Sequence, residues 1–240
     1  MSLEGKWIAS CVWDDIQVST SGLIAVQSAE GYGLLDANGE TLLPCKYRQI
    51  AVLRSKSDAS YDDLSFLSVC SGDKWGIYSL QDKKWLLPCE YESVSQYSKS
   101  YGYSEFAGYA LLRSEGRIGL YDLAREEMLL PCQYDDVAVM LSSAEQNCAV
   151  LIMDGKSGLF DLDRKQFILP CAYKTLGRAG EKLIVTEQSG EEGSVYGLCS
   201  FDGREILPCI YKSIQFSEGY ITALENGYYI ILNENGERTF

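Results

Sequence analysis

One short motif, Leu-Pro-Cys-X followed by Tyr, occurs five times in the chain and contains every proline that the chain has. The five prolines are Pro44, Pro88, Pro131, Pro170 and Pro208. Successive prolines are 44, 43, 39 and 38 residues apart. Self-similarity at such a period is typical of a repeat protein, in which one supersecondary unit recurs and neighbouring units share a core.

A second motif accompanies the first. A glycine lies upstream of each proline, at Gly33, Gly76, Gly119, Gly158 and Gly197. Apolar residues follow each glycine, and Tyr, Trp, Ile or Ser precedes it. The chain also opens on a degenerate tetrad, with Ser10 at the proline position and Trp13 at the tyrosine position. It closes on a degenerate glycine motif, in which we place Tyr229 at the glycine position. The sequence therefore predicts six repeats.

Cutting the chain just before each tetrad's strand divides a single repeat domain, 1–240, into 7–40, 41–84, 85–127, 128–166, 167–205 and 206–240. Within each repeat, apolar runs of four to eight residues rich in Val, Ile, Leu and Tyr are bounded by Gly, Asn, Asp and Ser, which is typical of strands. Asn38-Gly39, Asp202-Gly203 and Asn235-Gly236 indicate hairpins with type I′ turns. Each repeat is expected to be an antiparallel meander of three or four strands, and no stretch has helical periodicity.

The prolines and glycines constrain this meander further. Proline has no N–H to donate to a neighbouring strand, so the tetrad is expected on an edge strand or at a bulge, where one repeat leads into the next. The recurring glycine indicates a place inside the sheet where another backbone segment approaches closely.

The combination of an aromatic-Gly-Leu-X-Asp run, a glycine turn and Leu-Pro-Cys-X-Tyr-Asp-X-Ile resembles the WG-repeat (KWG-repeat) family of bacterial proteins. The resemblance covers essentially all six repeats, although the literal Trp-Gly pair occurs only at Trp75-Gly76. It implies a β-repeat fold and leaves the biochemical role undefined.

Two architectures fit six such meanders, and both are all-β. We favour a closed, six-bladed, propeller-like ring, because blades of ~40 residues are usual and closure protects the sheet edges. The alternative is an open β-superhelix or solenoid, in which the terminal strands act as caps.

Composition excludes several classes of function. The net charge is −13 and no basic cluster occurs, so we expect neither nucleic-acid binding nor attachment to an anionic membrane. No run of ~18 apolar residues predicts a transmembrane helix. No signal peptide is visible, and a cytoplasmic location is expected for a chain whose cysteines are free.

The nine cysteines and the missing histidines bear on chemistry. Six cysteines occupy the same repeat position, where they are expected to pack as small apolar residues rather than form disulfides. Without histidine the usual zinc patterns and Ser-His-Asp systems are absent, so we expect no metal, no cofactor and no enzymatic activity. Adjacent acids such as Asp135-Asp136 are interpreted as residues of a turn or of the link between two repeats.

The second and third repeats are the longest, and their extra residues, 54–63 and 97–106, are rich in Tyr and Ser. Insertions in repeat proteins lie in loops, often on a binding face. The candidate binding residues are Tyr61, Tyr97, Tyr101, Tyr103 and Phe106. The favoured function is a non-catalytic scaffold that binds a protein partner. One alternative is a carbohydrate or cell-wall-fragment binder, and another is a hydrolase or lyase that uses carboxylates on a propeller-like scaffold.

Overall fold

The fold was analysed in a computed structural model, which describes residues 12–19, 22–53, 65–96, 108–142, 147–180, 183–191 and 193–239, with the backbone alone for 138–142. These residues form 23 strands and no helix, in six antiparallel sheets. The all-β class and the six repeated meanders are confirmed. No helix in the described ranges is long and apolar enough to cross a membrane.

The strands are grouped into sheets in chain order, and each sheet is a meander of consecutive strands. Sheet 1 contains β1 (Asp15–Val18), β2 (Ile24–Ser28), β3 (Gly31–Leu35) and β4 (Thr41–Tyr47). Sheet 2 contains β5 (Gln49–Leu53), β6 (Phe66–Ser71), β7 (Lys74–Ser79) and β8 (Lys84–Tyr91). Sheet 3 contains β9 (Ser93–Gln96), β10 (Tyr109–Ser114), β11 (Arg117–Asp122) and β12 (Glu127–Tyr134).

The remaining sheets follow the same plan. Sheet 4 contains β13 (Asp136–Ser142), β14 (Asn147–Met153), β15 (Lys156–Asp161) and β16 (Gln166–Tyr173). Sheet 5 contains β17 (Thr175–Ala179), β18 (Leu183–Gly190), β19 (Gly193–Ser200) and β20 (Glu205–Tyr211). Sheet 6 has three strands, β21 (Ser213–Ser217), β22 (Tyr220–Glu225) and β23 (Tyr228–Asn233).

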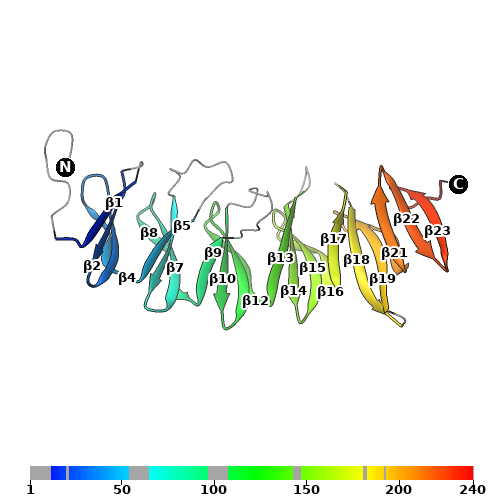
Figure 1. Ribbon diagram of the computed structural model, residues 1–240, viewed down its shortest axis with the longest axis horizontal. Helices are drawn as coiled ribbons and strands as arrows, with labels where there is room; N and C mark the ends of the chain where they lie inside the picture. The colour runs from blue at the N-terminus through cyan, green and yellow to red at the C-terminus, as the bar shows by residue number, and fades with distance from the viewer. Residues whose placement is uncertain are drawn as a thin grey trace. The chain divides into compact units, whose positions relative to one another are not determined.

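The chain divides into two compact units, Met1–Cys132 and Gln133–Phe240. Within each unit, successive sheets pack face to face (Figure 1). The core therefore lies between sheets: Leu34 and Leu43 of sheet 1 meet Val69 of sheet 2, and Leu159 of sheet 4 meets Ile184 of sheet 5. Closure of the six sheets into a ring stays a prediction.

The five prolines lie where the sequence predicts them. Each belongs to the last strand of a four-stranded sheet, β4, β8, β12, β16 or β20, and this strand forms one edge of its sheet. All five side chains are exposed. Pro44, Pro88, Pro170 and Pro208 lie inside the bulge of their strand and have no Cα partner on the neighbouring strand, so the missing N–H costs no ladder hydrogen bond there. The repeats cut from the sequence begin with this strand, whereas each sheet ends with it.

A single residue joins each tetrad strand to the next sheet, at Arg48, Glu92, Asp135, Lys174 and Lys212. The backbone N–H of this residue donates a hydrogen bond to the second strand of the following sheet. Arg48 donates to the Cys70 carbonyl at 2.9 Å, and Asp135 donates to the Ile152 carbonyl at 2.8 Å. Asp14 donates in the same way to Gln27 at 2.8 Å. This bond confirms the predicted placement of Trp13 at the tyrosine position.

The two motifs form one contact, which we call the Gly–Cys contact. In sheet 4 a Cβ atom added to Gly158 would lie 2.7 Å from the Cys171 nitrogen and 2.9 Å from the Leu169 oxygen. Opposite this glycine the tetrad strand bulges. Ser157 pairs with Tyr173 and Leu159 pairs with Leu169, so an advance of two residues on β15 is matched by four residues on β16. The same approach occurs at Gly33, Gly76, Gly119 and Gly197. The glycine is therefore required by the backbone that crosses it.

The cysteine of the tetrad uses the space that the glycine leaves. Its Sγ atom lies across the glycine and donates to a carbonyl of the second strand of the same sheet. Cys45 reaches Val26 at 3.7 Å, and Cys89 reaches Val69 at 3.4 Å. A small side chain with a weak donor suits this position. The prediction that these cysteines serve packing is confirmed for the five that the structure describes.

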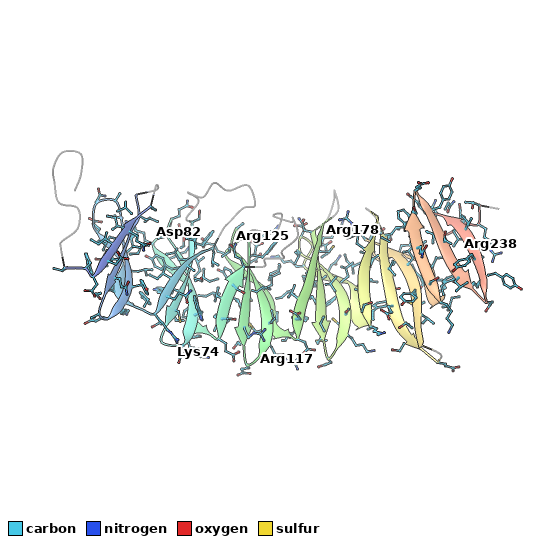
Figure 2. All side chains as sticks on the ribbon, in the orientation of Figure 1. Lys74, Asp82, Arg117, Arg125, Arg178 and Arg238 are labelled. Carbon is cyan, nitrogen blue, oxygen red and sulfur yellow. The ribbon has the colours of Figure 1, made fainter. Side chains whose placement is uncertain are left out.

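The hairpin between the third and fourth strands is capped by the residue three places after the glycine. Asp36 Oδ1 accepts from the Asn38 and Glu40 nitrogens, both at 2.9 Å. Asp122 accepts from the Ala124 nitrogen at 2.9 Å and pairs with Arg125 at 3.0 Å (Figure 2). These carboxylates are bound within their own turns.

The predicted type I′ turns at Asn38-Gly39, Asp202-Gly203 and Asn235-Gly236 are wrong, because only the glycine of each pair has positive φ. The Gly39 N–H donates to Asp36 at 3.0 Å, which makes residues 36–39 a turn that ends on glycine. Paired positive φ values occur instead at Glu115-Gly116, Asp154-Gly155, Glu218-Gly219 and Asn226-Gly227.

The alignment of the sixth repeat also changes. Asn233 caps its hairpin as Asp36 does, by accepting from the Asn235 and Glu237 nitrogens at 3.0 Å. Three residues before it is Ile230, which therefore occupies the glycine position. Tyr229, predicted at that position, takes the place of the aromatic residue before it.

Candidate binding groove

The described part of the first unit contains a groove of about 400 Å³ between sheets 1 and 2. Leu23, Ala25 and Leu34 form one wall, and Ile50, Val52 and Leu67 form the other. Such a volume lies in the range of small-molecule and side-chain pockets.

The groove follows from one repeat position. We call this the facing position: the residue of the second strand that pairs with the apolar residue after the repeat glycine. The facing residues of sheets 1 to 6 are Ala25, Ser68, Leu111, Val150, Val185 and Thr222. Ala25 is exposed, whereas Val150 is 2% exposed. The short alanine side chain leaves the space between sheets 1 and 2 unfilled.

Polar side chains also line the groove, mainly from β1, where Gln17 pairs with Ala25. Asp15, Gln17 and Gln27 line it together with Tyr32, which is exposed. Asp15 accepts from the Ile16 nitrogen at 2.9 Å and from Gln17 Nε2 at 3.2 Å. Its carboxylate is held by its neighbours, and the hydroxyl of Ser19, which also lines the groove, donates to the Leu23 carbonyl at 3.1 Å. The groove can therefore bind apolar groups, with hydrogen-bonding partners at its edge.

The thiols near the sheet interfaces are poor nucleophiles. Burial raises the pKa of the tetrad thiols, which belong to Cys45, Cys89, Cys132, Cys171 and Cys209. It raises the pKa of Cys148 and of Cys199 to about 12. A thiol with a raised pKa carries little thiolate at neutral pH, and the thiolate is the reactive form.

Carboxylates are likewise used within the fold. Asp161 is fully buried and accepts from the Asp163 and Arg164 nitrogens at 2.9 and 2.8 Å. Asp135 accepts from the Gly155 nitrogen at 3.1 Å, so it caps a turn, as predicted for the adjacent acids. Among the described residues, no group of three or more Cys, Asp or Glu side chains could hold a metal ion.

The binding residues predicted from the sequence, Tyr61, Tyr97, Tyr101, Tyr103 and Phe106, lie outside the described residues, as do both inserts. Their role stays a prediction. The first insert begins directly after Leu53, at the end of β5, and β5 supplies Ile50 and Val52 to the groove.

Sequence reasoning missed the groove. The signal that could have found it is the size of the side chain at the facing position. Ala25 of the run Leu-Ile-Ala-Val has only a methyl group, where sheets 4 and 5 have valine. Recognising this needs the pairing of strands, because every one of these runs is apolar.

Three solved structures resemble this chain distantly. A Kluyveromyces lactis Hsv2 structure with complete loop 6CD has 12% identity and a TM-score of 0.34, covering 74% of this chain and 59% of that one. KlHsv2 with loop 6CD replaced by a Gly-Ser linker has 11% identity and a TM-score of 0.31, covering 74% and 61%. A eukaryotic initiation factor structure has 11% identity and a TM-score of 0.26, covering 95% and 87%. The chain thus spans about three fifths of the Hsv2 structures, and these scores carry no functional argument.

A comparison with curated proteins gives no match. The family model described as WG containing repeat matches residues 196–229, which run from the aromatic position of sheet 5 to that of sheet 6. The match thus covers one full period of the repeat, with its glycine, its tetrad and Lys212, the residue that joins sheet 5 to sheet 6. Together with the four other copies of the Gly–Cys contact, it supports the assignment of this chain to the WG-repeat family.

Proposed function

We propose that this chain is a non-catalytic repeat module that binds a protein partner in the groove between sheets 1 and 2. The observation that carries the proposal is the exposed Ala25 at a position that sheets 3, 4 and 5 fill with Leu111, Val150 and Val185. Apolar pockets with a polar rim are the usual anchor sites for one or two side chains of a partner.

The charge of the chain favours a basic segment as the partner. A net charge of −13 attracts cations over long distances and speeds their association. Asp15 and the exposed Tyr32 at the rim suit a Lys or Arg beside the anchor, through a charge contact and a cation–π contact. We therefore expect the groove to select an apolar side chain that has basic neighbours.

A non-catalytic role agrees with the chemistry of the groove, whose walls are apolar and whose rim carboxylate is held by Ile16 and Gln17. A cytoplasmic location belongs to the same proposal, and the eight free cysteines in the described ranges support it.

The test is selection of peptides from a random displayed library, followed by fluorescence polarisation with the best synthetic peptide. Ala25→Trp fills the groove and should raise the Kd at least ~10-fold, because about 1.4 kcal/mol or more of apolar contact is lost. Ile210→Trp is the control, since Ile210 is an exposed apolar residue of β20 in the second unit. Equal affinities for the two variants, or a library without enrichment, would reject the groove as the site.

A further inference from the structure

The two edges of each sheet differ in their capacity to pair with another strand. Proline, a bulge or a charged side chain keeps an edge strand from pairing with a second chain. The strand that carries the tetrad forms one edge and contains the proline in β4, β8, β12, β16 and β20. The first strand forms the opposite edge in all six sheets, and it contains no proline. The first strands are therefore the edges at which a further strand can be added.

Most first strands are protected in another way. In β1 the Ile16 N–H donates to Asp15 Oδ1 at 2.9 Å, so a side chain already occupies this donor. In β13 a bulge lies between Val137 and Val139, and β17 carries the exposed Arg178 (Figure 2). β9 and β21 consist mainly of Ser and Gln. Each of these five edges is thus capped, bulged, charged or polar.

β5 has none of these features. Its sequence is Gln-Ile-Ala-Val-Leu, without a charged residue, and it pairs with β6 at five consecutive positions without a bulge. Gln49 stands where β1 has Asp15, and Val52 is 45% exposed although it lies within the strand. Among the described residues, β6 is the only strand that pairs with β5. A regular, apolar and uncharged edge of this kind is a template for an added strand.

The residues of β5 whose backbone faces the open edge are also those that line the groove. In an antiparallel pair, alternate residues direct their N–H and C=O groups away from the partner strand. Ile50 is the equivalent of Ile16, whose N–H donates to a side chain rather than to β2, so the backbone groups of Ile50 and Val52 face the open edge. Both side chains line the groove. A strand paired with β5 therefore directs every second side chain toward sheet 1, where Ala25 and Gln17 line the groove.

We propose that the partner binds at the groove as an extended segment that adds a strand to β5. This mode of binding rests on the proposed function and specifies the conformation and the residue pattern of the bound segment. An apolar residue opposite Val52 enters the groove beside Ala25. A Lys or Arg two residues away lies on the same face and suits the carboxylate of Asp15, which also lines the groove. The residue between these two points to the other face and is not selected.

The best peptide from the displayed library is the probe, and the first measurement concerns its backbone. A single N-methyl group replaces the N–H at each position in turn, and fluorescence polarisation gives the Kd for the wild-type chain. Alternate positions should raise the Kd at least ~10-fold and the positions between them less than ~2-fold, because only alternate N–H groups bond to β5. An effect without this alternation, or selected residues three and four apart as in a helix, would overturn the proposal.

The second measurement changes the edge of sheet 2. Val52→Pro removes an N–H that faces the open edge and leaves the pairing with β6 in place, so it should raise the Kd at least ~10-fold. Val52→Thr keeps this N–H and nearly the same side-chain size, and it is the control for the wall of the groove. Val18→Pro is the matched change at the equivalent residue of β1 and should leave the Kd unchanged. Circular dichroism establishes that the variants are folded.

The same variants separate the added strand from the groove. If Ala25→Trp weakens binding while Val52→Pro and the N-methylated peptides do not, the groove is the site and no strand is added. If Val18→Pro weakens binding in place of Val52→Pro, the segment adds to β1, and the assignment to β5 is wrong. If Ala25→Trp leaves the Kd unchanged, the groove is not the site and both proposals fail. Should Val52→Pro not fold, the N-methylated peptides decide whether a strand is added.

Discussion

The interface between sheets 1 and 2 and the interface between sheets 4 and 5 have the same construction and different contents. Both contain the Gly–Cys contact, formed by Gly33 and Cys45 in sheet 1 and by Gly158 and Cys171 in sheet 4. Val150 fills the second interface, whereas Ala25 leaves a groove of about 400 Å³ in the first. The repeat motif therefore fixes the backbone of each sheet, and at these two interfaces the residue at the facing position distinguishes a packed core from a groove.

This division explains how a repeat protein can change a binding site at little cost to its fold. The repeated glycine, proline and cysteine determine the backbone conformation of each sheet, so they do not indicate which ligand the chain binds. The residues that vary lie between sheets, where a change of one or two methyl groups opens or closes a space.

The largest expected effect comes from adding a side chain to the Gly–Cys contact. Gly158→Ala would place Cβ 2.7 Å from the Cys171 nitrogen, and backbone atoms cannot rotate away as a flexible side chain can. We expect the free energy of unfolding to fall by about 3 kcal/mol. Urea unfolding followed by circular dichroism measures this change.

The matched control is Gly177→Ala in β17, where an added Cβ meets nothing within 4 Å. It should be neutral or stabilising by less than about 1 kcal/mol, since alanine loses less backbone entropy than glycine. If both variants lose the same stability, close approach is not the reason for the repeated glycine.

The second prediction exchanges the contents of the two interfaces. Val150→Ala removes two buried methyl groups and should cost about 2 kcal/mol, because the packed sheets close only partly around the cavity. Ala25→Val adds the same two groups to an open groove and should change stability by less than about 0.5 kcal/mol. The urea midpoints of the two variants test this. A large loss for Ala25→Val would mean that sheets 1 and 2 are too tightly packed to admit a ligand.

Much of the fold could be predicted from the sequence, because proline and glycine restrict the backbone wherever they occur. The five prolines predict edge strands, and the five glycines predict close approach, and both are found. Sheet 6 has neither a tetrad proline nor the repeat glycine, which is why the predicted alignment of its last strand is wrong by one position. Only the hydrogen bonds of Asn233 show that Ile230 stands where the other repeats have glycine.

The groove could not be predicted in the same way. Whether Ala25 lies against a neighbour or leaves a space depends on what the next sheet places opposite it, and this requires the register of four strands. The sequence directed attention to the tyrosine-rich inserts, because unequal length is visible without a structure. The size of the side chain at one facing position can be interpreted only when the strand pairing is known.

The smallest expected effect concerns the charged contacts of Glu187, which sheet 5 has and sheet 1 lacks. Glu187 pairs with Thr175 at the start of sheet 5, and its carboxylate accepts from Lys174 at 2.7 Å, from Thr175 Oγ1 at 2.6 Å and from Ser194. In sheet 1 the same position holds Gln27, opposite Asp15. The contact with Lys174, followed by those with Ser194 and Thr175, lowers the pKa of Glu187 to about 2.

The sign of the pH dependence follows from this shift. The unfolded chain, in which the carboxyl has its ordinary value of 4.5, binds the proton before the folded chain does. The stability that Glu187 contributes is therefore complete above pH ~4.5 and is lost as the pH falls toward ~2. Glu187→Gln should be less stable than wild type at pH 7, and the two should converge over that window, as measured by thermal unfolding. A difference that stays constant over this window would show that the link between sheets 4 and 5 is not stabilised by the charge of Glu187.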